Sequence, residues 1–534
     1  MQRHPTYIPG SLALSRKFSE IARHKTWSVV VVGLLVLIVR AALIPVVGIP
    51  APEHHDEFGY LLSGDTFFHG RLTNPPHPMW IHFESFHIIQ HPTYSSIYPP
   101  AQGVVLAVGE FLGKPWIGQL LVTALMCSTI CWMLQGWFPP KWALYGALLV
   151  VLRIGVLRYW VNGYWSASAV ALGAALVLGA LPRIKKKQRI LDSILMAVGI
   201  TILANSRPFE GFVLCLTIAI ALLVWMTGAR RPVFKVTAVR VVAPLAIVLI
   251  AAAVATGYFY YRVTGSPLKM IYQVDSTTYN PVPYFLWQTP RSEPAYHHAV
   301  MQAFYEQDLY KFNDHRTLRG FFSYLVLRIS EDWSFYLGGL LTLPLLTLPW
   351  TIHDRRMRFP LIACVVFLIA LMSETWGMPH YAAPALGLLM LVVVQCARRL
   401  GLWTWHKYAV GRLFVQAIPL LLFATVIVRV STAAAHPGLQ KTWPRGNLER
   451  AEILKQIEQM PGKHLILVRY RPQHDLKIEW VYNGADIDGS KVVWSRDMGA
   501  RDNQELLQYF SDRTAWVLEA DETPPKLSSY LAAH

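Results

Sequence analysis

Acidic and histidine side chains gather in one long polar stretch, residues 48–100, that follows the first apolar segment. Asp56 and Glu57 are adjacent, and Glu84 follows later in the stretch. A carboxylate can take a proton from an attacking hydroxyl group or hold a divalent cation, so Asp56 and Glu57 are the first catalytic candidates. Asp56 and Glu84 are also the candidate cation ligands. The alternative is that all three are ordinary solvated loop acids.

The rest of this stretch offers candidates for binding a substrate. Glu84, His87 and His91 are spaced for one face of a helix or turn, where they could contact a phosphate or complete a metal site. Tyr98 precedes two prolines, whose fixed φ angles stiffen the end of the stretch. A histidine-rich surface without a role is the competing interpretation.

Four more candidates lie at the ends of apolar segments that are predicted to open on the same side. Placing an ionisable residue at membrane depth costs free energy, so we expect Arg207 and Glu210 to have a functional role. A guanidinium also matches the oxygens of a phosphate. His380 and Tyr381 begin another segment and could face the same cavity. The alternatives are an internal Arg207–Glu210 ion pair and an interfacial anchor at His380 and Tyr381.

The composition predicts that membrane helices position these residues. Of the 534 residues, 54% are hydrophobic, and apolar runs of about 18 residues or more recur along the chain. The formal net charge of +17 could suggest nucleic acid. Its Lys and Arg residues, however, cluster in short segments between apolar runs, which is the pattern of cytoplasmic loops and argues against a nucleic-acid partner.

We therefore predict a polytopic α-helical membrane protein with about 11 spans and one re-entrant or interfacial helix at 101–112. Residues 1–26 are expected in the cytoplasm, and residues 27–432 form the transmembrane domain, with exported loops at 48–100 and 260–332. The first of these loops contains a single Lys or Arg, at Arg71, as expected of a loop on the far side.

Residues 433–534 change to the pattern of a small soluble α/β domain, which we expect to be exported. Strands are predicted at 464–470, 491–495 and 515–519 from their Val, Leu, Ile and aromatic content. Helices are predicted after Asn447 and after Asp502, the latter with a capping box completed by Glu505. We expect this domain to close its own core and to be joined by a linker at 437–444.

Three segments carry a resemblance to a known family: HDEFGY at 55–60, SIYPP at 96–100 and HYAAP at 380–384. With the many spans and the soluble tail, residues 27–430 resemble the GT-C superfamily. The likeness is to the polyprenyl-phosphate-sugar transferases related to protein O-mannosyltransferases and the lipid A aminoarabinose transferase. By this resemblance Asp56 matches the catalytic acid and Glu57 its usual neighbour. Tyr98 stands where some relatives have a basic residue, and His380 where relatives often have Arg.

The resemblance implies inverting transfer of a sugar from a lipid phosphate, without a nucleotide. We expect a glycosyltransferase of the bacterial inner membrane with its active site on the exported side, whose acceptor is a glycan, a lipid or a protein. The site could also hold a divalent cation as a cofactor. The expected substrate-binding residues are Glu84, His91, Tyr98, Arg207, Glu210, His380 and Tyr381.

Two other classes of function stay open. A transporter or flippase for a lipid-linked glycan would favour polar, broken helices at mid-membrane depth, whereas the polar residues here cluster at loops and span ends. A protein that binds a lipid-linked glycan without transferring its sugar would need much the same groove.

Overall fold

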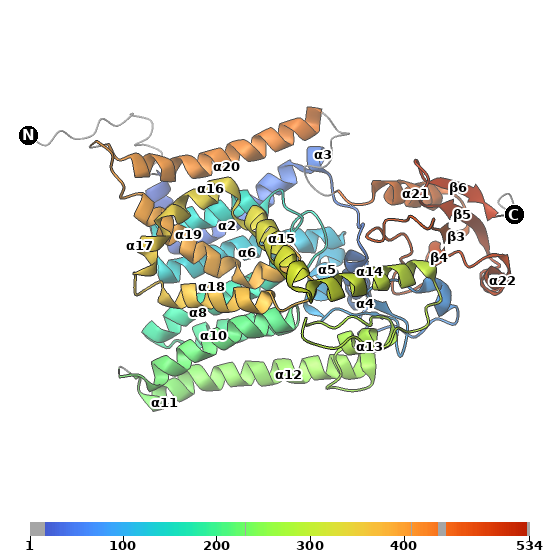
Figure 1. Ribbon diagram of the computed structural model, residues 1–534, viewed down its shortest axis with the longest axis horizontal. Helices are drawn as coiled ribbons and strands as arrows, with labels where there is room; N and C mark the ends of the chain where they lie inside the picture. The colour runs from blue at the N-terminus through green and yellow to red at the C-terminus, as the bar shows by residue number, and fades with distance from the viewer. Residues whose placement is uncertain (1–16, 230, 407, 436–444, 531–534) are drawn as a thin grey trace, which may run out of the picture.

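The computed structural model describes residues 17–229, 231–406, 408–435 and 445–530. Most of the chain is a bundle of apolar helices, and a small α/β domain lies at one end of it (Figure 1). Seven helices of the described chain are long and apolar enough to cross a membrane. The protein is thus a helical membrane protein with a small C-terminal sheet.

The long spans are single helices or continuous helical runs. In chain order they are α2 (Lys25–Ala42), α6 (Pro115–Trp137), α8 (Ala167–Lys187), α10 (Pro208–Thr227), the run of α11 (Phe234–Thr237), η3 (Ala238–Val242) and α12 (Ala243–Thr264), the run of η5 (Pro379–Ala385) and α19 (Leu386–Leu400), and α20 (Val410–Ala435). An eighth candidate is a pair of segments bent by 94°. It joins α15 (Leu318–Tyr336) to the run of α16 (Gly338–Thr342), η4 (Leu343–Thr347) and α17 (Leu348–Ile352).

Shorter elements complete the bundle. They are α5 (Ala101–Phe111), α7 (Pro140–Val150) with η2 (Val151–Gly155), α9 (Ile190–Ala204) and α18 (Arg358–Leu371). By length and composition, seven helices of the described chain are candidate spans, or eight with the bent pair, and the expected number of about 11 depends on these shorter helices. The short helix expected at 101–112 is present as α5.

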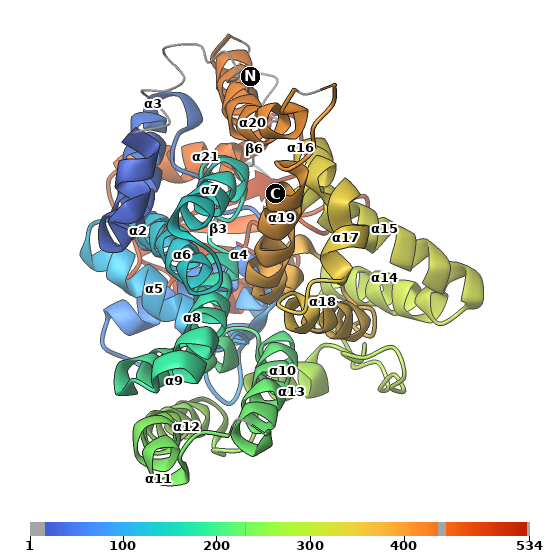
Figure 2. The same cartoon turned by 90° about the vertical axis from the view of Figure 1, so that its left-hand side faces the viewer.

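Helices α6 and α8 lie inside the bundle, and α12 lies at its edge (Figure 2). In α8, 78% of the most apolar window is buried, whereas in the run that ends with α12 only 6% is. Small residues allow the inner helices to approach closely. A Cβ atom on Gly118 of α6 would lie 2.0 Å from the Val105 carbonyl oxygen of α5, so these two helices pack backbone against backbone.

The two segments predicted as exported loops contain helices and short strands. The first follows the short helix α3 (Ile44–Val47) and holds α4 (His55–Phe68), η1 (Trp80–Phe83), β1 (Ile88–Ile89) and β2 (Ser95–Ser96). The second holds α13 (Ile271–Thr278), α14 (Ala299–His315) and most of α15. The expectation that Glu84, His87 and His91 share a helix face is wrong, because the backbone is irregular or extended after Phe83 and His87 has a positive φ of 60°.

The C-terminal domain is a four-stranded sheet with the order β4-β3-β5-β6. The three strands expected from the apolar pattern are present, and the central strand β3 (Lys463–Arg469) pairs in parallel with β4 (Val492–Arg496) and β5 (Arg513–Glu519). Strand β6 (Lys526–Ser529), which was not predicted, pairs antiparallel with β5.

Two helices cover the C-terminal sheet. The first, α21 (Leu448–Gln459), is capped by Asn447, whose side chain accepts a hydrogen bond from the Arg450 N–H at 2.8 Å, as predicted. The second, α22 (Ala500–Tyr509), begins before Asp502 instead of after it, so the predicted capping box is wrong. Asn503 accepts from the Met498 N–H at 3.0 Å at this end of the helix.

The C-terminal domain closes one core of its own, between α21 and the sheet, as expected from the sequence, but it shares a second core with the first exported loop. One hydrophobic cluster joins Leu465, Leu467, Ile487, Val493, Leu506 and Phe510 to four side chains of the first exported loop: Leu62, Phe83, Ile88 and Tyr94. The domain and the loop therefore fold as one packed unit. The predicted linker at 437–444 lies outside the described residues.

Candidate functional site

Asp56 lies in the first turn of α4 and is surrounded by hydrogen-bonding groups. Tyr98 donates its hydroxyl hydrogen to the Asp56 carboxylate. His55 Nδ1 lies 3.2 Å from one carboxylate oxygen, and His87 Nδ1 lies 3.6 Å from the other. The Asp56 side chain is still 19% exposed, so a substrate can reach its carboxylate.

These neighbours fix the charge on Asp56. Burial alone would raise the pKa of Asp56, but the contact with His87 and the hydrogen bonds from His55 and Tyr98 outweigh it, so the pKa lies well below its usual value. Burial lowers the pKa of His87 to about 4, against the attraction of Asp56. At neutral pH Asp56 is thus ionised.

Glu57 points to different partners. Its carboxylate accepts hydrogen bonds from the backbone N–H groups of Glu53 at 3.1 Å and Tyr164 at 3.0 Å, and it completes the cap of α4. A Cβ atom on Gly163 would lie 2.8 Å from Glu57 Oε1, so only glycine allows this close approach of the outer loop. Glu57 therefore ties α4 to the loop that precedes α8. Burial raises its pKa to about 7, although these N–H groups oppose the shift.

Three side chains at this site have the geometry to hold a metal ion. One ligand atom each from His55, Asp56 and His87 lies within 4.8 Å of the others. Imidazole nitrogen together with carboxylate oxygen suits a divalent cation. Glu84, the second candidate ligand from the sequence, lies outside this group and pairs with His297 instead.

Arg207 and Tyr381 form a second cluster at the membrane boundary. The guanidinium of Arg207 lies 3.9 Å from the centre of the Tyr381 ring and 3.5 Å from the Glu210 carboxylate. The ion pair named as an alternative is therefore formed. Both charged side chains are buried, and within the described chain the Arg207 Nε atom has no hydrogen-bond partner. An unpaired donor in a buried guanidinium is available to an anionic ligand.

The other residues near Tyr381 extend this cluster. His380 Nδ1 lies 3.2 Å from the Tyr159 hydroxyl, and its ring packs at 4.6 Å against Trp165. A second buried ion pair, Arg328–Glu374, joins α15 to the turn before η5 at 3.0 Å.

The aromatic rings of Tyr60 and Tyr98 pack together beside Asp56. They stack with their centres 4.1 Å apart, and the Tyr98 hydroxyl reaches Asp56. Burial raises the pKa of Tyr60 to about 12, an effect that the positive charge of Arg207 opposes and the negative charge of Asp56 adds to. Tyr60 thus lies within the electrostatic reach of both candidate groups.

An apolar cavity of about 690 Å³ lies beside the site. Side chains of α5, α8, α9 and α12 line it, and nearly all are apolar. Pro100 and Asn205 also line it, and each lies two residues from a site residue, Tyr98 and Arg207 respectively. The Ala101 N–H donates to the Asn205 carbonyl at 3.0 Å and holds these two segments together.

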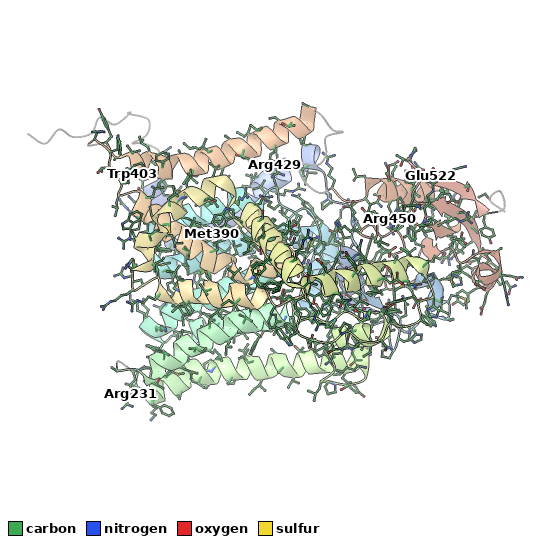
Figure 3. The ribbon with its side chains drawn as sticks, viewed as in Figure 1. Arg231, Met390, Trp403, Arg429, Arg450 and Glu522 are labelled. Atoms are coloured by element: carbon green, nitrogen blue, oxygen red, sulfur yellow. The ribbon has the colours of Figure 1, made fainter. Side chains whose placement is uncertain are left out.

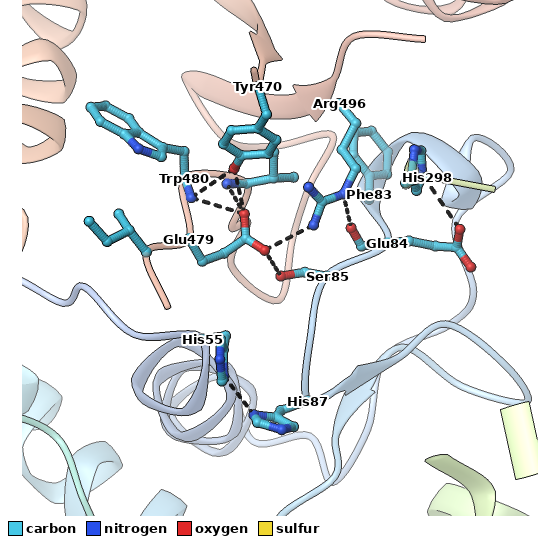
Figure 4. Close-up of polar contacts among 12 residues, drawn as sticks. His55, Phe83, Glu84, Ser85, His87, His298, Tyr470, Glu479, Trp480 and Arg496 are labelled. Carbon is cyan, nitrogen blue, oxygen red and sulfur yellow. Dashed lines mark hydrogen bonds and ion pairs between the residues drawn. The ribbon is translucent and has the colours of Figure 1, made fainter. Parts of the chain in front are cut away.

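Glu84 lies away from His55 and His87, between His298 of the second exported segment and Arg496 of the C-terminal domain (Figure 4). Glu84 Oε2 is 2.9 Å from His297 Nδ1 and 3.5 Å from His298 Nε2. His91 packs edge-on against Trp80 at 4.8 Å.

Arg496 of β4 completes this junction. It donates to the Glu84 carbonyl oxygen at 2.6 Å and to the Glu479 carboxylate at 2.9 Å (Figure 4). The same Glu479 carboxylate accepts from the Ser85 hydroxyl at 3.0 Å. The C-terminal domain therefore fixes the backbone at residues 84–85, close to His87.

The site residues predicted from the sequence did not include Arg328 or Glu374, and His55 and Tyr60 were noted only as part of the HDEFGY segment and without a role of their own. Arg328 was assigned to the exported loop 260–332, although its helix α15 is one half of the bent pair that together could form a broken span. A charged residue within such a segment is the signal that could have identified it. His55 and Tyr60 flank Asp56 in the sequence, but their contacts with His87 and Tyr98 become evident only in the folded chain.

The sequence matches no protein-family model and no curated protein. Among solved structures, ArnT from Cupriavidus metallidurans has 14% sequence identity and a TM-score of 0.49, over 98% of this chain and 94% of that one. The same protein bound to undecaprenyl phosphate has 12% identity and a TM-score of 0.46, over 92% of each chain.

The Archaeoglobus fulgidus oligosaccharyltransferase is also similar, with 13% identity and a TM-score of 0.45 over 83% of this chain. The present chain spans 62% of the length of that protein. It and ArnT are GT-C glycosyltransferases, the superfamily that the sequence resembles.

Proposed function

We propose that this protein is an integral membrane glycosyltransferase that moves a sugar from a polyprenyl phosphate to an acceptor on the exported side. The observation that carries the proposal is the apolar cavity, whose lining residues Pro100 and Asn205 each lie two residues from a polar cluster: Tyr98 beside Asp56, and Arg207. Asp56 is an ionised base that solvent can reach, and Arg207 is a buried cation with an unpaired donor. Transfer of a sugar from a lipid phosphate needs one group of each kind.

In the proposed reaction, Asp56 takes the proton of the acceptor hydroxyl group as that oxygen attacks the anomeric carbon of the sugar. The bond from the anomeric carbon to the phosphate oxygen breaks, and the polyprenyl phosphate leaves with the bonding electrons. Arg207 stabilises the charge that develops on the phosphate. Attack from the side opposite the leaving group inverts the anomeric configuration.

The other predicted residues have supporting places in this scheme. Glu57 positions Asp56, because its carboxylate holds the start of α4. Tyr98 orients the Asp56 carboxylate, while Glu210, His380 and Tyr381 form the surroundings of Arg207. Glu84 and His91 are retained as residues of the acceptor side, since the neighbouring His297 side chain is 44% exposed.

The apolar cavity supports a lipid donor. An isoprenoid chain is apolar throughout, and the cavity between α5, α8, α9 and α12 is lined at one place by Pro100 and Asn205, which lie two residues from Tyr98 and Arg207. A donor with its tail in this cavity would present its phosphate between the two clusters. His55, Asp56 and His87 could hold a divalent cation, which would supply additional positive charge near the leaving phosphate.

We further propose the orientation of the chain. The basic clusters between spans lie in the cytoplasm, and the C-terminal domain lies outside the bacterial inner membrane. In this arrangement α7, α9 and α18 also cross, which gives about 11 spans with the bent pair, while α5 lies at the interface.

Cysteine labelling tests this orientation. Exposed residues Ser292 and Ser511 should react with an impermeant thiol reagent from outside once replaced by Cys, and Lys186→Cys should not. The background should lack Cys215 and Cys364, which are the two native cysteines that are not fully buried. Labelling of Lys186→Cys with protection of Ser292→Cys would invert the topology.

Arg207→Ala is expected to weaken binding of the lipid donor by ~10-fold or more, because a charge-assisted contact with phosphate contributes ~1.5–3 kcal/mol. Direct titration with a synthetic polyprenyl-phosphate sugar measures this, and transfer is followed in parallel. Arg207→Lys should recover part of the affinity.

Arg262→Ala, at an exposed position at the end of α12, is the matched control and should bind the donor normally. Normal donor affinity in Arg207→Ala, together with loss of folded protein, would restrict Arg207 to a structural ion pair with Glu210. Donor binding by the parental protein without transfer to any acceptor would favour the non-catalytic binder.

A further inference from the structure

A second pocket lies at the opposite end of the helix bundle from the C-terminal domain. It has a volume of about 370 Å³ and is formed where α6 ends, α7 begins, α19 ends and the turn before α18 passes. Figure 3 shows Trp403, which directly follows the pocket residue Leu402, far from Glu522 of the C-terminal domain. The pocket is therefore separate from the candidate active site.

Three guanidinium groups line this pocket, from Arg356, Arg398 and Arg399. Among its described lining residues, Asp354 is the single carboxylate. The pocket therefore carries a net positive charge, which favours an anionic ligand.

The carboxylate of Asp354 is already engaged. One of its oxygens accepts from the Gln395 side chain at 2.9 Å and lies 3.8 Å from Arg399, and the other accepts from the Arg356 N–H at 3.0 Å. Gln395 in turn accepts from Arg398 at 2.9 Å. These bonds fix the walls of the pocket and leave the guanidinium of Arg356 without an ion pair among the described residues.

The remaining walls of the pocket are aromatic and apolar. Trp137, Phe138 and Trp142 line it, and the Arg398 guanidinium lies 5.5 Å from the centre of the Phe138 ring. At the rim, Leu402 is 75% exposed and the nearby Trp405 is 59% exposed. Exposed tryptophans at the ends of apolar helices are typical of the membrane interface, so the pocket lies at headgroup depth.

We propose that this pocket binds the phosphate of an anionic lipid headgroup, in the membrane leaflet opposite the C-terminal domain. The guanidinium groups of Arg356 and Arg398 contact the phosphate, and the acyl chains lie along the apolar rim at Leu402. Basic pockets between helix ends at the membrane surface suit lipids of this kind. Planar guanidinium groups match phosphate oxygens better than lysines would.

Native mass spectrometry of the full-length protein in detergent tests the proposal. The two probes are phosphatidylglycerol, which is anionic, and phosphatidylcholine, which is zwitterionic and has no net charge. The parental protein should retain phosphatidylglycerol in preference to phosphatidylcholine. Arg356→Gln and Arg398→Gln should each weaken that retention by ~10-fold, since each removes a charge-assisted contact. Arg356→Lys should lose less than Arg356→Gln if charge is the main contribution.

Arg355→Gln is the matched control, because Arg355 is exposed next to Arg356 but does not line the pocket. Equal loss in Arg355→Gln and Arg356→Gln would overturn the proposal and assign retention to general surface charge. Titration with inorganic phosphate distinguishes a soluble ligand from a lipid. Tight binding of inorganic phosphate without a preference for phosphatidylglycerol would overturn the assignment to a lipid. If Arg398→Gln does not fold, the test rests on Arg356→Gln, because Arg356 lies on an exposed turn where the substitution should not disturb folding.

Discussion

Asp56→Asn is expected to lower the rate of sugar transfer by ~100-fold or more while the affinity for the lipid donor changes little. The substitution keeps the size of the side chain and one acceptor oxygen, but an amide cannot take the acceptor proton. Tyr98 can still donate to the remaining oxygen, so the surroundings should stay in place. The measurement is transfer from a synthetic polyprenyl-phosphate sugar, with donor titration on the same preparation.

Two further variants test whether the loss of rate is specific to Asp56: a control at an exposed carboxylate, and a substitution of the neighbouring Glu57. Asp502→Asn removes an exposed carboxylate of α22 and should leave transfer unchanged. Glu57→Gln keeps an oxygen for the backbone N–H groups at the start of α4, so its loss of rate should be smaller than that of Asp56→Asn. Transfer at the parental rate by Asp56→Asn would remove Asp56 from the reaction and favour the interpretation that the protein only binds its lipid.

Local patterns in the sequence predicted the elements of this fold well. Long apolar runs marked the spans, and a capping residue marked the start of α21 at Asn447. The three β-rich segments became β3, β4 and β5. Strand β6 was not predicted, because Lys526–Ser529 is mostly polar, lies at the sheet edge and shows no alternation of apolar and polar residues.

The candidate site could be predicted only in part, because it depends on contacts between distant residues. The Asp-Glu pair was evident, but the different roles of its members follow from partners such as Tyr164, which is 107 residues from Glu57. The spacing of Glu84 and His87 suggested one shared face. In the structure a positive φ at His87 turns that ring toward His55, while Glu84 faces His297. Spacing alone contains no information on such a reversal.

The same limit applied to the C-terminal domain, which was expected to fold by itself. Its strands have apolar side chains on both faces, and a sheet of this kind needs cover on each. Helix α21 covers one face, but the other is completed by Leu62, Phe83, Ile88 and Tyr94 of the first exported loop. Truncation before residue 445 would leave these four side chains exposed.

Arg496→Leu is therefore expected to destabilise the exported part of the protein by ~3–5 kcal/mol. Arg496 and Glu479 are both buried, so removal of the arginine leaves an uncompensated carboxylate in the interior. Thermal unfolding in a mild detergent, followed by the fluorescence of tryptophans such as the buried Trp480, measures the change.

The control is Arg471→Leu, which breaks an ion pair with Glu522 between two exposed side chains and should cost less than ~1 kcal/mol. The double variant Arg496→Leu/Glu479→Gln should recover part of the stability, because a neutral amide replaces the unpaired charge. A loss in Arg496→Leu no greater than that in Arg471→Leu would show that the junction contributes little.

The junction should also influence chemistry, because Arg496 holds the Glu84 carbonyl only three residues before His87. In a preparation of Arg496→Leu that remains folded, the position of His87 beside Asp56 is expected to loosen. A reduced rate of transfer with unchanged donor affinity would identify the C-terminal domain as a positioning element of the site. Unchanged transfer would limit its contribution to stability. Loss of Arg496 should affect transfer and not donor affinity, because Arg496 holds the backbone segment that leads to His87. Arg207, which is proposed to bind the donor, lies instead at the start of α10.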